Sequence, residues 1–193
     1  RFLAKAGVFG QPGASIASSP ANFYGPRDVA VDQQGRVYVS DTGNKRIQVF
    51  TPEGQFVTQW GGKGLDEGRM DEPVGLAVAP DGRSYVADTW NQRIQVFGSD
   101  FAYLYEWPVD AWYGQSVVNK PYLAVDRNGN VYVTDPGYYR VLVFDSQGAY
   151  RLSFGQYGFD ERSRRMALLA AHPGVTFDDI RANSGFELIV PDQ

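Results

Sequence analysis

The sequence predicts an all-β fold made of repeated four-stranded units, the arrangement found in the blades of a β-propeller. One observation is a segment that recurs three times in the 193-residue chain: Gly25–Phe50, Glu72–Phe97 and Lys120–Phe144. A second is that the anchor residues of these copies recur at a constant spacing of 47 residues. A third is that each copy alternates short apolar runs with turns rich in glycine, asparagine and aspartate. Together they indicate a repeat architecture and not a single irregular core.

Each copy is expected to form four short strands. In the first copy they fall at Val29–Val31, Val37–Val39, Ile47–Phe50 and Gln55–Trp60. These runs are β-branched or aromatic and partly alternate with polar residues, as half-buried strands do. Turn signals such as Gln34-Gly35 and Pro52-Glu53-Gly54 separate them. Four strands in a unit of roughly 45 residues are typical of a propeller blade.

The repeats resemble the NHL repeat. The residues that carry the resemblance are Pro73–Val78, Asp81–Val86 and Asp88–Phe97, and the likeness covers about residues 1–158. It implies a propeller, commonly of six blades, that binds a ligand on one face. Phe2–Gly7 matches the last strand of a further blade, so three whole blades and one orphan strand are expected. Because they form an incomplete ring, this portion is a fragment, half of a ring completed by self-association, or a set of blades whose open sides a partner covers.

The last part of the chain departs from the repeat. Residues 159–193 are expected to form a small α/β tail in which a helix, Phe177–Ala182, lies between strands Met166–Ala171 and Phe186–Val190. The tail resembles the C-terminal end of a class I CoA-transferase small subunit of the glutaconate CoA-transferase type. The residues behind this likeness are Phe159-Asp160, His172–Thr176 and Ser184–Leu188. That family's catalytic glutamate lies in a segment this chain does not contain, so no transferase activity is expected. A chance likeness in a capping strand–helix–strand is the alternative.

The amino-acid composition argues against several kinds of site and partner. The chain has no cysteine, one histidine (His172) and a formal net charge of −4. Multi-histidine and thiolate metal sites are therefore excluded, and no metal or cofactor is expected. The net negative charge argues against a nucleic-acid partner. No apolar run approaches the roughly 20 residues of a membrane-spanning helix, so no direct membrane span is expected.

An aspartate and an arginine flank the same loop in all three copies: Asp41 and Arg46, Asp88 and Arg93, Asp135 and Arg140. One interpretation is a ring of arginines that binds anions. The other is an ion pair within each blade, with loop hydrogen bonds that fix the turn. Repetition in every copy favours the structural interpretation, because a site needs asymmetry.

Aromatic residues break the repeat and are therefore the candidate ligand contacts: Trp90, Trp112, Tyr113, Tyr138 and Tyr139. Trp90, Tyr138 and Tyr139 replace small or polar residues of the first copy, and Trp112 and Tyr113 lie in the linker between the second and third copies. Aromatic side chains in loops suit stacking on peptides or sugars. Packing between loops is the structural alternative.

The sequence thus favours a non-catalytic scaffold that recognises a protein, peptide or glycan through its loop face. The alternative is part of an enzyme: a lactonase- or lyase-type propeller, or a segment associated with a CoA-transferase. A third interpretation is a purely structural element of an assembly. The sequence does not determine the compartment, and an extracytoplasmic or cell-surface location is one option.

Overall fold

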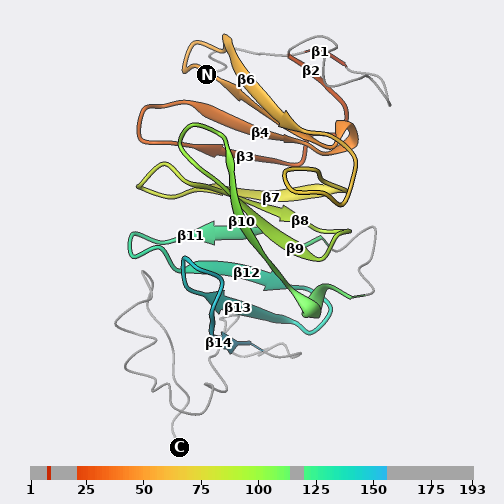
Figure 1. The fold of residues 1–193 in the computed structure, drawn as a ribbon, viewed down its shortest axis with the longest axis vertical. Helices are drawn as coiled ribbons and strands as arrows, with labels where there is room; N and C mark the ends of the chain where they lie inside the picture. Colours follow the sequence, from red (N-terminus) through yellow and green to blue (C-terminus); the bar gives the residue numbers. More distant parts are fainter. Residues whose placement is uncertain (1–7, 10–20, 114–119, 156–193) are drawn as a thin grey trace, which may run out of the picture.

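The computed structural model describes residues 8–9, 21–113 and 120–155, which form three four-stranded antiparallel sheets (Figure 1). The first sheet contains β3 (Asp28–Val31), β4 (Val37–Asp41), β5 (Arg46–Phe50) and β6 (Phe56–Gly61). The second contains β7 (Pro73–Val78), β8 (Ser84–Asp88), β9 (Arg93–Phe97) and β10 (Tyr103–Pro108). The third contains β11 (Leu123–Val125), β12 (Val131–Asp135), β13 (Arg140–Phe144) and β14 (Tyr150–Phe154). The predicted all-β propeller fold is confirmed, with one sheet per repeat.

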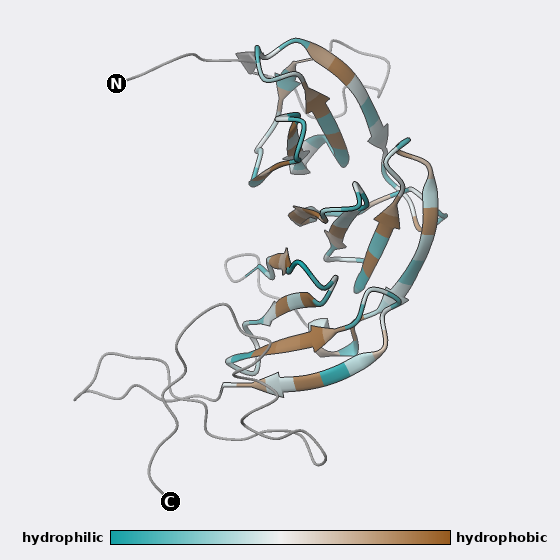
Figure 2. Cartoon of the chain, turned by 90° about the vertical axis from the view of Figure 1, so that its left-hand side faces the viewer, coloured by the Kyte–Doolittle hydropathy of each residue, from teal (hydrophilic) through white to brown (hydrophobic). Residues whose placement is uncertain are grey.

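The sheets are stacked as neighbouring blades along a curved arc (Figure 2). The first strand of each blade contacts the first strand of the next, β3 against β7 and β7 against β11. Within each sheet the strands pair in chain order, so the fourth strand lies at the other edge. Two short 3₁₀ helices, η1 (Thr42–Asn44) and η2 (Asp110–Trp112), occur in connections.

Aromatic side chains fill the space between the first two blades. Tyr38 of β4 packs edge-on against Trp60 of β6, with ring centroids 6.3 Å apart. Trp60 in turn lies 5.4 Å from Phe97, which belongs to the next blade. Phe101, from the β9–β10 turn, packs on the same tryptophan at 5.4 Å. Flat blade faces are buried in this way only against a neighbour.

The second interface repeats the same arrangement one period later. Tyr85 packs against Trp107 at 6.2 Å, and Trp107 lies 6.0 Å from Phe144 of the third blade. The repeat therefore encodes the contact between blades as well as the blade itself.

A β-bulge occurs at the same place in every blade, where the third strand meets the fourth. The final phenylalanine of the third strand packs edge-on against an aromatic residue of the fourth strand. The three pairs have centroid distances of 6.0–6.1 Å: Phe50 and Phe56, Phe97 and Tyr103, Phe144 and Tyr150. The bulge brings these two rings together across the ladder.

Two predicted segments lie outside the described residues: the orphan strand Phe2–Gly7 and the tail, residues 159–193. Nearby, β1 (Val8–Phe9) pairs in parallel with β2 (Asn22–Phe23). Phe23 of β2 packs on Phe50 at 5.6 Å. It thus gives Phe50, in the first blade, an aromatic neighbour from an earlier segment of the chain.

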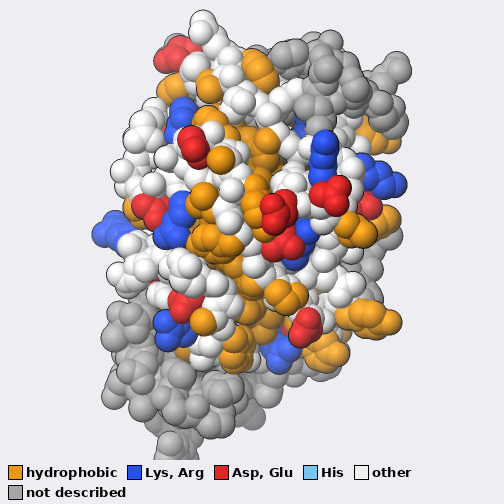
Figure 3. Space-filling model, viewed as in Figure 1, with side chains coloured by type: hydrophobic (Ala, Val, Ile, Leu, Met, Phe, Trp, Pro, Cys, Tyr) orange, Lys and Arg blue, Asp and Glu red, His pale blue; other side chains and the backbone are white. Residues whose placement is uncertain are grey.

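The outer surface carries a hydrophobic band flanked by charged side chains (Figure 3). Exposed apolar residues of the fourth strands contribute to this surface: Phe56, Val57, Leu104 and Tyr150. In the described part of the chain, no helix is long and apolar enough to cross a membrane.

Candidate binding face

The antiparallel order of each blade places two kinds of connection at one end of the strands. These are the loops between second and third strands and the connections from one blade to the next (Figure 1, right-hand side). We call this end the connection face. The opposite end, the turn face, carries the short turns between first and second strands and between third and fourth strands.

A buried aspartate organises the connection face of the first blade. Asp41 ends β4, and its carboxylate is completely buried. Its Oδ2 accepts hydrogen bonds from Arg46 Nε at 2.8 Å, Asn44 Nδ2 at 2.9 Å and Gln48 Nε2 at 3.0 Å. Its Oδ1 accepts the backbone N–H of Tyr24 at 2.7 Å. One carboxylate thus joins the loop, β5 and the segment entering the blade.

The second blade repeats this network around Asp88. The donors to Oδ2 are Arg93 Nε at 2.9 Å, Asn91 Nδ2 at 2.8 Å and Gln95 Nε2 at 3.0 Å. The backbone N–H of Asp71 donates to Oδ1 at 2.7 Å. Desolvation by burial raises the pKa of Asp88 despite these donors.

The arginines of both networks are directed into the protein. Arg46 also donates to Gln59 Oε1 and to the carbonyl of Asn22. Arg93 also donates to backbone carbonyls of the preceding interblade connection: those of Leu65, Asp66 and Arg69. Since these guanidinium groups already have protein acceptors, the geometry is that of an ion pair fixing each loop and not of an anion-binding ring.

The third blade keeps only part of the network. Asp135 Oδ2 accepts from Arg140 Nε at 2.8 Å. Tyr138 stands where the other copies have asparagine, and Leu142 where they have glutamine. The Arg140 side chain is 35% exposed, compared with 1% for Arg46. Its guanidinium lies 5.1 Å from the Tyr138 ring, which has turned to the surface.

All three loops use one residue in the left-handed region at the same place: Lys45, Gln92 and Tyr139, with φ of 57°, 54° and 55°. The three loops therefore share this backbone feature while their side chains differ. A rigid frame with variable side chains is the usual arrangement of a recognition surface.

Four of the five aromatic candidates are exposed on the connection face. The exposed fractions are 53% for Trp90, 84% for Tyr113, 62% for Tyr138 and 57% for Tyr139. Trp112 corrects the expectation from sequence, because it is only 1% exposed and packs in the core between the second and third blades. The 3₁₀ turn η2 directs it inward, and its Nε1–H donates to the carbonyl of Thr134 at 3.3 Å.

An open pocket of about 500 Å³ lies on the same face. It is lined by Tyr24, Gly25, Pro26, Arg27, Thr42, Gly43, Lys45 and Glu72. Lys45 Nζ lies 2.9 Å from Glu72 Oε2 and 3.0 Å from Asp71 Oδ1. Burial acts to lower the pKa of Lys45, but the hydrogen bonds and charges of these two carboxylates outweigh it and raise the pKa.

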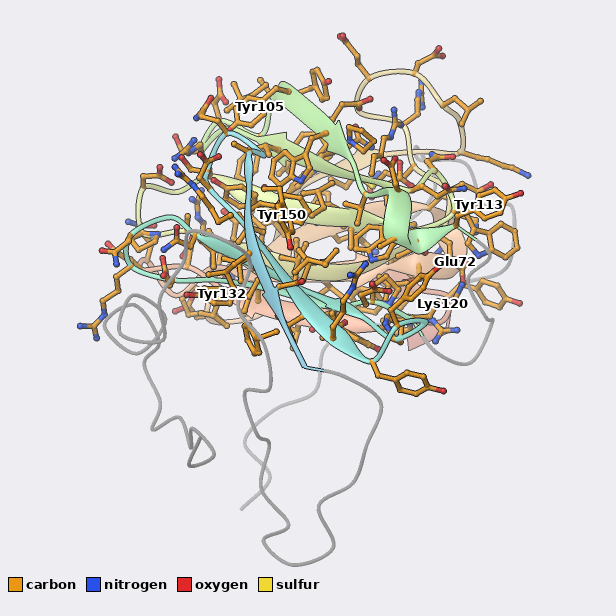
Figure 4. All side chains as sticks on the ribbon, turned by 90° about the horizontal axis from the view of Figure 1, so that it is seen from below. Glu72, Tyr105, Tyr113, Lys120, Tyr132 and Tyr150 are labelled. Atoms are coloured by element: carbon orange, nitrogen blue, oxygen red, sulfur yellow. The ribbon has the colours of Figure 1, made fainter. Side chains whose placement is uncertain are left out.

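A second lysine lies near Glu72, one of the residues that line the pocket. Lys120 is buried, and its Nζ is 4.0 Å from Glu72 Oε1. Both ammonium groups lie near the Trp90 ring, Lys45 Nζ at 5.6 Å and Lys120 Nζ at 5.2 Å from its centroid. Figure 4 shows Glu72, Lys120 and Tyr113 on one side of the molecule, with Tyr132 on the opposite side.

Sequence reasoning missed this charged cluster, although a signal was present. A proline recurs at the start of each repeat, and the residue before it is Gly25, Glu72 or Lys120. These equivalent positions carry no charge, a negative charge and a positive charge. Asymmetry at one repeat position is the same signal that identified the aromatic candidates. Among the described residues, no group of three or more His, Cys, Asp or Glu side chains is arranged to hold a metal ion.

Comparison with known proteins identifies the repeat. Residues 23–50 and 70–97 match the sequence profile of the NHL repeat. These two segments are therefore similar to NHL repeats. The third copy lies outside these two ranges, and it is the copy that lacks the asparagine and glutamine of the loop network.

Two curated relatives contain similar segments. NHL repeat-containing protein 3 of Homo sapiens is 44% identical over 52 residues, which is 26% of this chain and 15% of that protein. RING finger protein nhl-1 of Caenorhabditis elegans is 38% identical over 69 residues, 36% of this chain and 7% of that protein. The chain thus spans only a small part of these relatives.

Solved structures share the fold at low sequence identity. Virginiamycin B lyase from Staphylococcus aureus superposes with a TM-score of 0.53 at 16% identity, over 69% of this chain and 42% of the lyase. The WD40 repeats of RRP9 give a TM-score of 0.53 at 14% identity, over 70% of this chain and 39% of that structure. The chain spans less than half of either structure, and the likeness shows a propeller fold alone.

Proposed function

We propose that this chain is a non-catalytic binding platform whose connection face recognises a protein, peptide or glycan. The observation that carries the proposal is the gathering of four exposed aromatic side chains, Trp90, Tyr113, Tyr138 and Tyr139, on this one face. Aromatic residues lose little conformational entropy on binding and bury a large area, so they dominate many recognition surfaces.

The buried networks support this proposal because they hold the loops in place before a ligand arrives. Asp41 and Asp88 each bind three side chains and one backbone N–H. A loop that is already ordered loses less entropy on binding than a mobile one.

The test is a binding screen of the full chain on a glycan array and on random peptides displayed on phage. Any ligand found is then measured against Tyr113→Ala and Tyr138→Ala, with Leu104→Ala as the control. Leu104 is 46% exposed but lies on the outer strand β10, away from the connection face. The proposal predicts weaker binding for at least one tyrosine variant and unchanged binding for the control. Unchanged affinity in both tyrosine variants would contradict the role of these exposed aromatic side chains in recognition.

A further inference from the structure

The pocket on the connection face has a surplus of positive charge. The cation cluster at this pocket consists of Arg27 and Lys45, which line it, and Lys120, which lies 4.0 Å from the pocket residue Glu72. The carboxylates close to this cluster are Asp71 and Glu72. Both carboxylates are already bonded to Lys45. Arg27 lines the pocket, is exposed, and forms no ion pair with any described residue. Three positively charged side chains are therefore balanced by only two carboxylates.

Lys120 makes this surplus of positive charge unfavourable in the protein without a ligand. Its side chain is only 1% exposed, and its Nζ has no hydrogen-bond acceptor among the described residues. Its nearest carboxylate oxygen, at 4.0 Å, is beyond hydrogen-bond distance. A buried ammonium without an acceptor is unfavourable, and a further anion nearby would offset that cost. Burial lowers the pKa of Lys120, and the charges of Arg27 and Lys45 lower it further against the opposing effect of Glu72.

We propose that this pocket binds the carboxylate of an acidic peptide segment, with Arg27 as the direct partner and Lys45 and Lys120 as supporting charges. This inference rests on the proposed function and specifies its ligand. A guanidinium at the rim of an open pocket offers two parallel donors to a carboxylate. One added negative charge would balance the cation cluster.

The surroundings of Trp90 favour a peptide over a sugar at this pocket. Two ammonium groups lie within 6 Å of the Trp90 ring, which leaves less of its face for the flat stacking that a sugar requires. A carboxylate that approaches the cation cluster needs no free ring face. The aromatic residues Tyr113, Tyr138 and Tyr139 remain available for the rest of the segment.

The test uses the full chain and random linear peptides displayed on phage. Selected peptides are synthesised with a fluorescent label, and each Asp, Glu or C-terminal carboxylate is replaced in turn by its amide. Binding is measured by fluorescence polarisation to the wild type, Arg27→Ala, Lys120→Met and the control Arg127→Ala. Arg127 is also exposed, but it lies in the β11–β12 turn on the turn face.

We expect the selected peptides to be acidic and one amide replacement to weaken binding by about tenfold or more, the worth of a charge-assisted hydrogen bond. Arg27→Ala should weaken binding similarly, and Arg127→Ala should leave it unchanged. Lys120→Met should weaken binding while the urea midpoint stays the same or rises, because it removes an unpartnered buried charge. Raising the salt concentration should weaken the wild-type complex more than the Arg27→Ala complex.

Other outcomes separate this inference from the proposed function. Peptides that bind through the tyrosines but are indifferent to Arg27→Ala and to amide replacement would overturn the carboxylate site and leave the binding platform intact. Ligands found only on the glycan array would do the same. A screen without any ligand that depends on the connection face counts against both.

Discussion

At the scale of single residues, buried aspartates define the loops of the connection face. Asp41 is surrounded by donors, and the Arg46 side chain is 1% exposed. Without the carboxylate, a buried guanidinium would lose its counter-charge. Asp135 performs the same role with fewer donors, and its Arg140 reaches water.

Asp41→Ala should therefore lower the free energy of unfolding by about 3–5 kcal/mol, the range for breaking a buried ion pair. Asp135→Ala is the matched control and should cost less, because solvent can hydrate Arg140. Urea unfolding followed by tryptophan fluorescence measures both. Equal losses for the two variants would show that the extra donors around Asp41 contribute nothing.

Aspartates in the turns of the turn face make the folding stability of the chain depend on pH in the acid range. Asp32 Oδ2 accepts from Arg36 Nε at 2.6 Å, and its Oδ1 accepts the backbone N–H groups of Gln34 and Arg36. Burial acts to raise the pKa of Asp32, but these hydrogen bonds and the charge of Arg36 outweigh it and lower the pKa below 3.8.

The stability contributed by Asp32 should be fully present above pH 3.8, the ordinary value, and should be lost as the pH falls through the lower pKa of the folded state. Asp32→Asn should thus be less stable than the wild type at pH 7, and the difference should shrink at acid pH. Urea midpoints from pH 7 down to pH 2 measure it. A difference that stays constant over this range would contradict the assignment.

At the scale of elements, the turn between the third and fourth strands of the third blade packs against Trp107 of the preceding blade. Gly148 has φ +84°, and a Cβ placed there would lie 2.5 Å from Trp107. Gly129, in the β11–β12 turn, has φ +83° but only an ordinary contact of 3.4 Å, to Ser146 Cβ. The two positions share a positive φ that disfavours a side chain, and they differ in the steric contact that an added Cβ would make.

Gly129→Ala should lower the stability by about 1–2 kcal/mol, the cost of a left-handed residue with a side chain. Gly148→Ala should lose about 1–3 kcal/mol more, because Trp107 must move within a packed interface. Urea unfolding of both variants gives the comparison. If the two losses are equal, the Gly148 turn does not press on the tryptophan.

Repeats made the elements predictable from the sequence. Anchors 47 residues apart locate twelve strands because each copy repeats the same turns, and the aspartate–arginine pairs follow from the same spacing. The bulge near Phe97 and Tyr103 was not predictable, because the alternation of apolar and polar residues does not reveal an extra residue in one strand. Trp112 was misassigned to the surface because the 3₁₀ turn that directs it inward has no clear sequence signal.

At the scale of the whole molecule, three blades place the asymmetric residues of different repeats on one face. Lys45, Glu72 and Lys120 come from three separate repeats and meet only because neighbouring blades adjoin through their first strands. Sequence reasoning could identify each as a departure from the repeat, but their contact depends on the angle between blades. The candidate site is therefore a property of the arc and not of any single blade.

The connection face, and not the turn face, is the surface that we expect to bind the ligand. Hydrogen–deuterium exchange of the full chain, with and without the tightest-binding peptide or glycan from the screen, tests it most directly. We expect slower exchange in residues 24–27, 42–45, 89–92 and 137–139, with no change in the turns of the turn face. Protection confined to the turns at residues 32–36, 80–83 and 126–130 would contradict it.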